Sequence, residues 1–402
     1  MAAAVNSGDG GKRDETAASR LAGAKNAQAG EFKAPLRYND SMDDYLIVGS
    51  GLTGAVIARA LSDAGHSVLV AERRSHAGGN VHEQTHASGI PFHTYGPHYF
   101  RTNSEKLWDY VHRFAKFRPF EAVLKSWVDG RYENWPIAGS YIRRTANGWT
   151  PSPTATPQNF EEASLAMMPR VVYEKFVKGY SEKQWGVPAT ALSANLAKRF
   201  DVREDDEPRL MRHKFQGLPE NGYSAFMAKM LDGIRIIVGC DYLKRRSEFA
   251  ARHIVFTGPI DEYFGFERGR LKYRGQRREH QFLPDTEWHQ PCIQVNNPDA
   301  ANGPHIRTVE WKHLLPPEQR DGISGTLLTR EVTVTPDDPN EYEYPFPDDA
   351  NAKLYGAYAE QARSIPNLLI CGRLGEYCYY DMDQAIGRAQ VLAQRLIDEA
   401  AR

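Results

Sequence analysis

Residues 45–54 read YLIVGSGLTG, a short apolar run that breaks into a Gly-x-Gly-x-x-Gly turn. The four residues before the turn have the character of a buried strand. Gly49 permits the tight turn, Gly51 lets the backbone approach a pyrophosphate, and Gly54 lets the following helix pack against the strand. This stretch predicts a dinucleotide site in which a helix N-terminus faces phosphate charge.

The segments after the turn continue the same pattern. Residues 55–64 (AVIARALSDA) have the apolar spacing of a helix, and residues 66–71 (HSVLVA) read as a second strand. Glu72 follows 18 residues after Gly54, close to the ~20 expected for an acid that holds a ribose hydroxyl pair. This order favours a dinucleotide site over an ordinary βαβ unit with a glycine-rich turn.

The composition excludes several classes of function. The chain has 402 residues, too many for one small core, and a formal net charge of −1 from 50 basic and 51 acidic residues. This balance gives no reason to expect nucleic acid as a partner. No apolar run approaches the ~20 residues that cross a bilayer, so no membrane span is expected.

The four cysteines form no C-x-x-C pair and have no histidine at metal spacing, so no metal site is predicted. Scattered thiols in a large chain suit a reducing cytoplasm. Residues 1–41 are rich in small and polar side chains and lack the apolar core of a secretory signal, which predicts a disordered leader. Met42, just before the first predicted strand, is a candidate for the biological start.

A second glycine-rich feature lies near the end of the chain. Residues 367–371 (NLLIC) read as a strand, 372–383 (GRLGEYCYYDMD) as a turn and 384–402 as a helix. In many FAD folds the closing helix points its N-terminus at the flavin. Glycine sites at both ends of the chain, with the paired glycines of the loop 73–80 (RRSHAGGN), favour FAD over NAD.

The middle of the chain has a different character. Residues 103–215 are mostly helical in pattern, and 201–212 (DVREDDEPRLMR) read as a mobile surface loop. Phe176 and Tyr180 lie four residues apart, which places them on one helical face, where core packing is the ordinary interpretation. His98 lies in a tight loop between aromatic residues, and taken alone it is more often structural than catalytic.

Several long motifs, in a consistent order, resemble those of the bacterial UDP-galactopyranose mutases. They are YSEKQWG (180–186), HKFQGLP (213–219), FTGPIDEYFG (256–265), LTREV (328–332) and GRLGEYCYYDMDQ (372–384). The resemblance covers nearly the whole chain from Met42 onwards. It implies a cytoplasmic homodimer that interconverts the pyranose and furanose forms of a nucleotide-linked sugar in cell-wall polysaccharide synthesis, with UDP-galactose as the expected substrate.

The resemblance also implies a cofactor and a mechanism. The family uses FAD and is active only when the flavin is reduced, so an external reductant such as NAD(P)H is expected. Flavin N5 then attacks the anomeric carbon and expels the nucleoside diphosphate, with no net redox change. No activated serine, cysteine or histidine nucleophile is needed.

The implied fold class is α/β, with a Rossmann-like FAD-binding domain, a helical domain and a twisted antiparallel sheet domain. We expect the FAD-binding domain at about 42–102, 220–260 and 365–402. The helical domain with its mobile loop is expected at about 103–215, and the sheet domain at about 261–364.

The resemblance assigns roles to individual residues. The catalytic set is Arg199, Arg307, His98 and Arg373, of which Arg199 and Arg307 stabilise the diphosphate. The substrate-binding set comprises Asn103, Phe176, Tyr180, Trp185, Asn296, Glu331, Tyr344, Tyr379 and Asp381. Within it, Phe176, Tyr180 and Trp185 form the aromatic surface on which uridine stacks, called here the uridine wall. The cofactor-binding set is Gly49, Ser50, Gly51, Thr53, Gly54, Glu72, Arg73, Gly79, Asn80, Gly372, Arg373, Asp381 and Met382.

Two positions depart from the family's pattern. The family has a tyrosine five residues before its F-Q-G motif, where this chain has Leu210, and Arg209 or Arg212 could replace that donor if the loop closes differently. The family's G-P-H-I-F-H-T is here GPHYFRT, with Arg101 in place of the second histidine. Both changes suggest a different nucleotide-linked hexose or pentose.

Two other functions remain open at this stage. An amine-oxidase-like flavin oxidoreductase would share the FAD architecture, but it would reduce its flavin in proportion to the substrate consumed. A catalytically silent protein that only binds a nucleotide sugar is the other alternative. Arg199, Arg307, Arg373 and Asp381 argue against it, because a protein that had lost its activity would have no reason to keep all four.

Overall fold

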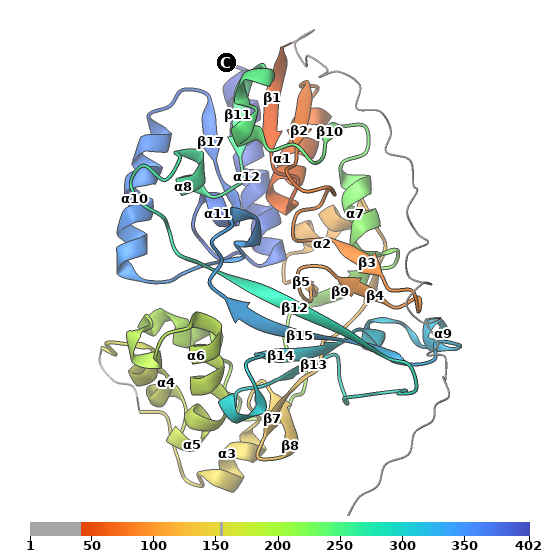
Figure 1. The fold of residues 1–402 in the computed structure, drawn as a ribbon, viewed down its shortest axis with the longest axis vertical. Helices are drawn as coiled ribbons and strands as arrows, with labels where there is room; N and C mark the ends of the chain where they lie inside the picture. The colour runs from red at the N-terminus through yellow and green to blue at the C-terminus, as the bar shows by residue number, and fades with distance from the viewer. Residues whose placement is uncertain (1–41, 153–155) are drawn as a thin grey trace, which may run out of the picture.

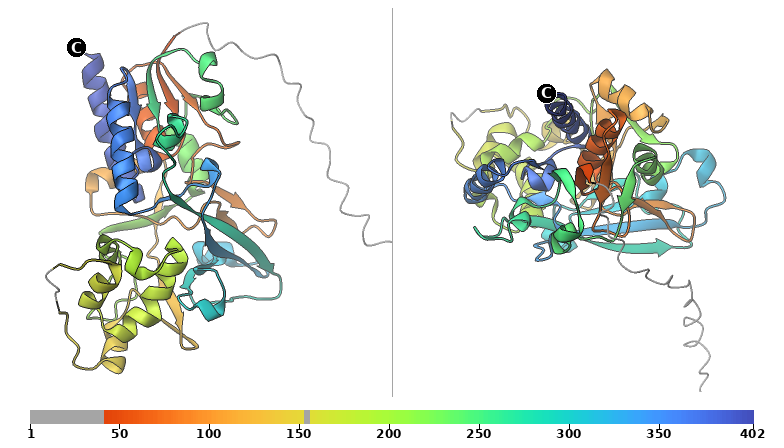
Figure 2. Two further views of the ribbon diagram at one scale, coloured as in Figure 1. Left: turned by 60° about the vertical axis from the view of Figure 1, so that its left-hand side comes forward. Right: turned by 90° about the horizontal axis from the view of Figure 1, so that it is seen from above.

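The computed structural model describes residues 42–152 and 156–402, so the predicted leader at 1–41 lies outside the described residues. A parallel sheet lies at one end of the molecule, a cluster of helices at the other, and a long twisted sheet between them (Figure 1). The left view of Figure 2 also places the C-terminal helix and the helical cluster at opposite ends. The predicted α/β fold class is confirmed by this arrangement.

The parallel sheet has the strand order β10-β2-β1-β11-β17, and each neighbouring pair runs parallel. Its strands are β1 (Asp43–Val48), β2 (Val68–Ala71), β10 (Arg235–Ile237), β11 (Ala251–Phe256) and β17 (Leu368–Ile370). Helix α1 (Leu52–Asp63) begins directly after the glycine turn, as the sequence predicts. Gly49 there has a φ of 101°, a backbone conformation that favours glycine.

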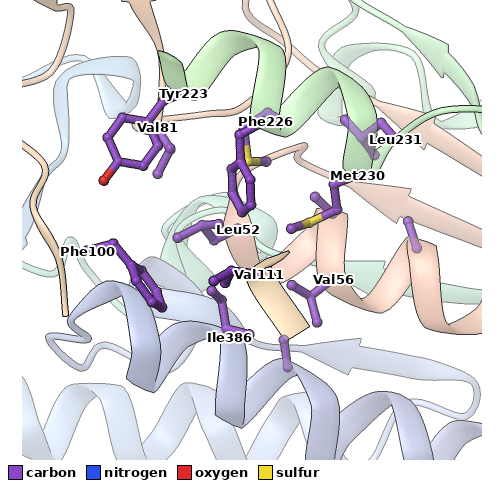
Figure 3. Packing of buried hydrophobic residues seen from close by; sticks show 14 of the residues in the cluster. Leu52, Val56, Val81, Phe100, Val111, Tyr223, Phe226, Met230, Leu231 and Ile386 are labelled. Atoms are coloured by element: carbon purple, nitrogen blue, oxygen red, sulfur yellow. The ribbon is translucent and has the colours of Figure 1, made fainter. Parts of the chain in front are cut away.

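Helices from distant parts of the chain meet in one apolar core beside α1. They are α2 (Glu105–His112), α7 (Gly222–Met230) and α12 (Met382–Ala400). Figure 3 shows Val56 of α1, Phe226 of α7 and Ile386 of α12 converging on this core. Burial of a side chain of this size contributes about 1.5–3 kcal/mol. The core therefore joins the N-terminal and C-terminal segments that carry the two glycine turns.

The second sheet, called here the mixed sheet, has the order β16-β12-β15-β14-β13-β7-β8. Its strands are β7 (Leu124–Val128), β8 (Arg131–Trp135), β12 (Tyr273–Leu283), β13 (Gln294–Asn296), β14 (Arg307–Glu310), β15 (Thr326–Val334) and β16 (Tyr344–Pro345). The pair β13–β7 is parallel, whereas the other pairs are antiparallel. The sequence predicted an antiparallel sheet drawn from 261–364 only.

The hairpin β7–β8 corrects the prediction that residues 103–215 are mostly helical. Asp129 and Gly130 form its turn with φ angles of 51° and 74°. Asp-Gly between two alternating segments is a strong hairpin signal, because both turn residues must adopt positive φ. The sequence interpretation passed over this dipeptide, and the hairpin adds its strands to the edge of the mixed sheet.

The helical cluster occupies the rest of that segment. It contains α3 (Gly139–Thr145), α4 (Phe160–Met167), α5 (Arg170–Val172), the π-helix η1 (Tyr173–Lys178), α6 (Gly179–Trp185), η2 (Ala189–Ala191) and η3 (Ala194–Arg199). These elements share an apolar core of their own, which includes Phe160, Tyr173 and Phe176.

Smaller elements complete the described chain. The strands are β3 (Glu83–Thr85) and β4 (Pro91–His93), which pair together, and β5 (Phe100–Thr102), β9 (Phe215–Pro219) and β6 (Phe117–Pro119), which form a sheet in that order. The helices are α8 (Ile260–Tyr263), α9 (Pro317–Arg320), α10 (Asp349–Arg363), α11 (Gly372–Gly375), η4 (Tyr242–Lys244), η5 (Arg246–Glu248), η6 (Ala300–Asn302), η7 (Trp311–Leu314) and η8 (Pro339–Glu341).

Helix α10 packs on α8 and β17, although its residues fall in the range predicted for the sheet domain. The predicted domain bounds stay a prediction. Within residues 42–152 and 156–402, no helix is both long and apolar enough to cross a membrane.

Candidate active site

Adjoining cavities run from the parallel sheet to the helical cluster. The inner cavity is lined by both glycine turns and the end of β2, and its residues include Gly49, Gly51, Thr53, Gly54, Glu72, Arg73, Gly79, Asn80, Gly372 and Met382. The middle cavity shares His98 and Arg373 with the inner cavity. The outer cavity shares Tyr180, Arg307 and Tyr379 with the middle one. Ligands in the inner and middle cavities would therefore meet at His98 and Arg373.

Glu72 fixes the shape of the glycine turn. Its Oε2 atom accepts hydrogen bonds from the backbone N of Ser50 at 2.9 Å and from Ser50 Oγ at 2.6 Å. Its Oε1 atom accepts from the backbone N of Arg74 at 2.8 Å. Ser50 Oγ in turn accepts from the backbone N of Gly78 at 3.1 Å, so the predicted residue Ser50 lies behind the cavity wall and braces it.

The inner cavity is shaped for a ligand that lies close to backbone. A Cβ atom on Gly79 would lie 2.7 Å from the Cα atom of Gly51, so a side chain there would fill the space between the two loops. Helix α1 begins beside this cavity without a side-chain cap and without an acidic residue in its first turn. Its free N–H groups and dipole favour an anion such as a pyrophosphate. These residues fit a dinucleotide.

His98 and Arg373 lie where the inner and middle cavities meet. Nδ1 of His98 lies 2.7 Å from the carbonyl oxygen of Gly96, and since a carbonyl only accepts, Nδ1 carries the proton and Nε2 keeps its lone pair. Burial, with the nearby charge of Arg373, lowers the pKa of His98 to about 4. His98 is therefore a neutral imidazole near pH 7.

The floor of the middle cavity comes from one face of the mixed sheet. The register places Asn296 directly beside Arg307 across β13 and β14, so the two side chains point to the same face. In the neighbouring row, Leu124 lies beside Gln294 on one side and Trp135 on the other. All of these residues line the middle cavity. The paired residues Asn296 and Arg307 make a polar part of the floor, whereas Leu124 and Trp135 make the neighbouring part largely apolar.

A buried ion network holds Arg307 in the floor. Glu331 is fully buried and accepts from both Arg307 and Arg278, and Arg278 also pairs with Glu343 at 2.8 Å. Burial alone would raise the pKa of Glu331, but the two arginines outweigh it and hold that pKa below its usual value. Glu331 lines none of the three cavities described here, and its carboxylate contacts Arg307 and Arg278 instead.

Aromatic and cationic side chains line the outer cavity. The rings of Tyr344 and Tyr379 stack with centroids 6.0 Å apart. The guanidinium of Arg199 lies 4.6 Å from the Tyr379 ring centroid and that of Arg373 lies 4.8 Å from it. Trp185 lines the same cavity, edge-on to Phe346. The structure thus brings the predicted residues Arg199, Tyr180, Trp185, Arg307, Tyr344 and Tyr379 together.

Asp381 joins the site from the start of α12. It lines the middle cavity and accepts from Nη2 of Arg101 at 2.9 Å. Arg101 lines the same cavity, so this departure from the family's pattern lies at the site.

Besides Ser50 and Glu331, two more predicted residues line none of these three cavities. Phe176 is fully buried in the core of the helical cluster, edge-on to Tyr141, which corrects its placement in the uridine wall. Asn103 accepts from the backbone N of Lys214 at 2.9 Å and does not line the middle cavity, which corrects its placement at the sugar. Asn103 instead ties the end of the 201–214 loop to β5.

The structure also adds residues that sequence reasoning missed. Tyr99, Leu124, Trp135 and Gln294 line the middle cavity. Arg203 is buried and donates to the backbone of the 201–212 loop, at Glu207, Arg209 and Leu210. The alternation of β7 gave a usable signal for Leu124, whereas no local pattern marks Arg203.

Comparison with known proteins identifies relatives along most of the chain. Residues 175–379 match the family model described as UDP-galactopyranose mutase, and residues 47–114 match a NAD(P)-binding Rossmann-like domain. The chain is 32% identical to a probable UDP-galactopyranose mutase of Klebsiella pneumoniae over 372 residues, 89% of this chain and 95% of that protein. It is 30% identical to a dTDP-fucopyranose mutase of Escherichia coli over 378 residues, 89% of this chain and 99% of that protein.

The fold is similar to that of a solved relative. A crystal structure of reduced UDP-galactopyranose mutase superposes with a TM-score of 0.69 at 15% sequence identity, covering 90% of this chain and 97% of that one. At this identity the likeness concerns the fold alone.

Proposed function

The chain belongs to the UDP-galactopyranose mutase family, and from that premise we propose that it interconverts the pyranose and furanose forms of a nucleoside-diphosphate sugar with FAD as cofactor. It is an isomerase of that type. One observation carries the proposal: the inner cavity, whose residues fit a dinucleotide, shares His98 and Arg373 with a cavity lined by Arg307, Tyr344 and Tyr379. A nucleophile held in the inner cavity would face a sugar diphosphate in the middle one.

We infer FAD rather than a nicotinamide dinucleotide as the cofactor, because both glycine turns line the inner cavity. The cavity runs from the glycine turn at Gly49 to the second glycine turn at Gly372, at the start of α11. Glu72 has lone pairs left for a ribose hydroxyl, because each carboxylate oxygen accepts more than one hydrogen bond. A reduced flavin bound there would supply the nucleophile for the anomeric carbon, with no net redox change.

The chain's own residues stabilise the departing diphosphate. Arg307 and Arg199 face it with charges that persist at any working pH, and Glu331 holds Arg307 in place before the substrate arrives. Burial raises the pKa of Tyr344, so its hydroxyl stays protonated and donates to a phosphate oxygen. Each charge-assisted hydrogen bond contributes roughly 1.5–3 kcal/mol.

His98 is suited to accept a hydrogen bond at the junction of the cavities. Its Nε2 lone pair accepts a hydrogen bond from a sugar hydroxyl or from the cofactor while Gly96 fixes the ring. Tyr180 and Trp185 offer ring surfaces to a base in the outer cavity. The homodimer, the cytoplasmic location and the external reductant that the resemblance implies stay predictions.

A direct assay identifies which sugar and which nucleotide the substrate carries. The full-length flavin-loaded protein is reduced with dithionite under anaerobic conditions and incubated with UDP- and dTDP-linked sugars, and the products are resolved by chromatography. We expect a furanose product while the flavin absorbance stays that of the reduced form. The oxidised protein is the control, and we expect it to be inactive. Oxidation of the sugar by the oxidised protein, in proportion to flavin reduced, would contradict the proposal and favour an oxidoreductase instead.

A further inference from the structure

Helix α6 turns different faces to the outer cavity and to a loop of the mixed sheet. The face towards the outer cavity carries Tyr180, Ser181, Gln184 and Trp185. Gly179 and Lys183 lie four residues apart, so they share another face of the helix. A Cβ atom on Gly179 would lie 2.2 Å from the carbonyl oxygen of Pro298, so the backbone of α6 passes close to the loop 297–306, which joins β13 to β14.

Lys183 clamps this loop to the helix. Its Nζ atom donates to the backbone carbonyls of Asn297 at 3.0 Å, Asp299 at 2.7 Å and His305 at 3.2 Å. An ammonium group has three N–H donors, so each of these carbonyls takes one. Lys183 is half-buried and lines none of the three cavities, so any effect on a bound ligand must pass through the elements that it joins.

The loop carries a residue of the cavity floor at each end. Asn296 is the last residue of β13 and Arg307 is the first residue of β14, and both line the middle cavity. The backbone N of Asn297 donates to the carbonyl of Ile306 at 2.8 Å, and Nδ2 of Asn297 donates to the carbonyl of His305 at 3.0 Å. These bonds close the loop, so its position and that of Arg307 change together.

We propose that Lys183 is a positioning residue, which holds Tyr180 and Trp185 on α6 at a fixed distance from Arg307 and so sets the affinity for a nucleoside diphosphate. This inference rests on the proposed function, in which one ligand spans both groups. A base on the tyrosine and tryptophan rings and a diphosphate on Arg307 belong to a single molecule, so their binding groups must keep one separation. A displacement of about 1 Å between such groups is enough to lower a rate about 100-fold.

A second contact keeps the helix in place when the clamp is removed. Arg274 on β12 is buried, and its Nε atom donates to the carbonyl of Gln184 at 3.0 Å, near the end of α6. Trp185 also packs in the core of the helical cluster. Loss of the Lys183 ammonium should therefore shift α6 relative to the loop without unfolding it.

The charge of Lys183 changes within a measurable range of pH. Burial lowers the pKa of Lys183 to about 8, although the carboxylate of Asp299 opposes the shift. His305 also faces it from the loop, but burial, with the nearby charge of Lys183, lowers the pKa of His305 to about 4, so this ring is neutral at pH 7. The full clamp is therefore present below about pH 8 and weakens above it, because a neutral amine has fewer N–H donors than there are carbonyls.

The first test measures the affinity for UDP and for dTDP by calorimetry, with the full-length flavin-loaded protein at pH 7. Lys183→Met keeps an apolar stem and removes the donors. We expect the Kd of each nucleotide that the wild type binds to rise at least about tenfold, the effect of losing one charge-assisted hydrogen bond. Lys178→Met, at an exposed lysine five residues earlier, is the matched control and should bind as the wild type does.

The possible failures of this test are distinct. Kd values for Lys183→Met within threefold of the wild type overturn the inference and leave the mutase function standing. A wild type that binds neither nucleotide contradicts the proposed function, and the inference with it.

The second test uses pH, and it stays decisive if Lys183→Met does not fold. Between pH 7 and pH 9 the Kd of the wild type should rise at least threefold, as the clamp loses its proton. Lys183→Arg keeps its charge at pH 9, so its Kd should rise by less than half as much. Titration of the nucleotide is common to the two proteins and cancels in the comparison. A merely structural role would not make the pH profile depend on the residue at 183, so equal profiles overturn the inference.

Discussion

Nη2 of Arg101 on β5 donates to Oδ2 of Asp381, the N-cap residue of α12, at 2.9 Å. The backbone N of Asp381 also donates to Oε1 of Gln384, which closes a capping box at the helix start. The ion pair therefore ties the first turn of α12 to β5, and both partners line the middle cavity. Met382, the next residue, lines both the inner and the middle cavities, so the pair helps to set the shape of the junction.

Replacing Arg101 by Gln should loosen the start of α12. A partly exposed pair contributes about 0.5–1 kcal/mol, which corresponds to a two- to fivefold weaker retention of flavin. Titration of the apoprotein with FAD, followed by flavin fluorescence, measures the effect. Arg113→Gln breaks the exposed pair with Asp63, away from the cavities, and should leave flavin affinity unchanged. Equal affinities for FAD in the two variants would contradict the proposal that Arg101 helps to shape the cofactor site.

Replacing Arg307 by Lys tests the diphosphate contact. Lysine keeps the charge that neutralises Glu331 but loses the planar fork that matches a phosphate. We expect kcat/KM to fall about 10- to 100-fold, because one charge-assisted hydrogen bond is lost or weakened. The thermal midpoint should change little. Arg330→Lys changes an exposed neighbour on β15 and is the control. A rate within threefold of the wild type would remove Arg307 from the catalytic set.

The features that the sequence predicted well depend on local interactions. The strand, the turn at Gly49 and helix α1 follow one another within about 20 residues, and Glu72 lies at the end of the next strand. Each of these follows from φ, periodicity or spacing along a short segment. Arg307 and Tyr344, which the resemblance assigns to the phosphates, line the same cavity although they lie on different strands.

Phe176 shows where the role carried over from the resemblance failed, whereas core packing, the ordinary interpretation of its spacing, is what the structure has. The sequence placed it on one face with Tyr180, four residues away, which assumes an α-helix. Residues 173–178 instead form a π-helix, whose wider turn breaks the spacing of 3.6 residues. Phe176 therefore points into the core of the helical cluster, while Tyr180 lines the cavity. Arg203 was missed for a different reason, since its partners are backbone carbonyls that only the folded loop brings together.

His98 predicts a pH dependence of stability. Its pKa in the folded protein is about 4, below the value near 6.5 of an exposed histidine, so the unfolded chain binds the proton more tightly. The stabilisation is present above pH 6.5 and is lost as the pH falls from 6.5 towards 4. At pH 5 the loss from this group amounts to about 2 kcal/mol.

His98→Gln should therefore show a smaller drop in thermal midpoint between pH 7.5 and pH 5 than the wild type shows. His112→Gln, at an exposed position on α2, should keep the drop of the wild type. The measurement is the midpoint followed by circular dichroism at both pH values. His93 lies beside His98, and burial also lowers its pKa, so part of the drop should persist in His98→Gln. Identical drops in all three proteins would refute the buried neutral state of His98.

Gly79 tests whether the inner cavity needs a close approach of two loops. Its φ is 57°, and a Cβ atom there would lie 2.7 Å from the Cα atom of Gly51, whose backbone cannot move without shifting the start of α1. Gly79→Ala should therefore weaken flavin retention at least about tenfold, since a clash of this kind costs more than 1.4 kcal/mol. Gly356→Ala is the control, because a Cβ atom there meets nothing within 4 Å, and in helix α10 alanine should be neutral or stabilising. Flavin absorbance per protein after gel filtration gives the readout. Full flavin content in Gly79→Ala would mean that the loop 73–80 does not pass closely over the cofactor. The glycine pair of that loop, Gly78 and Gly79, would then lose its proposed role in cofactor binding.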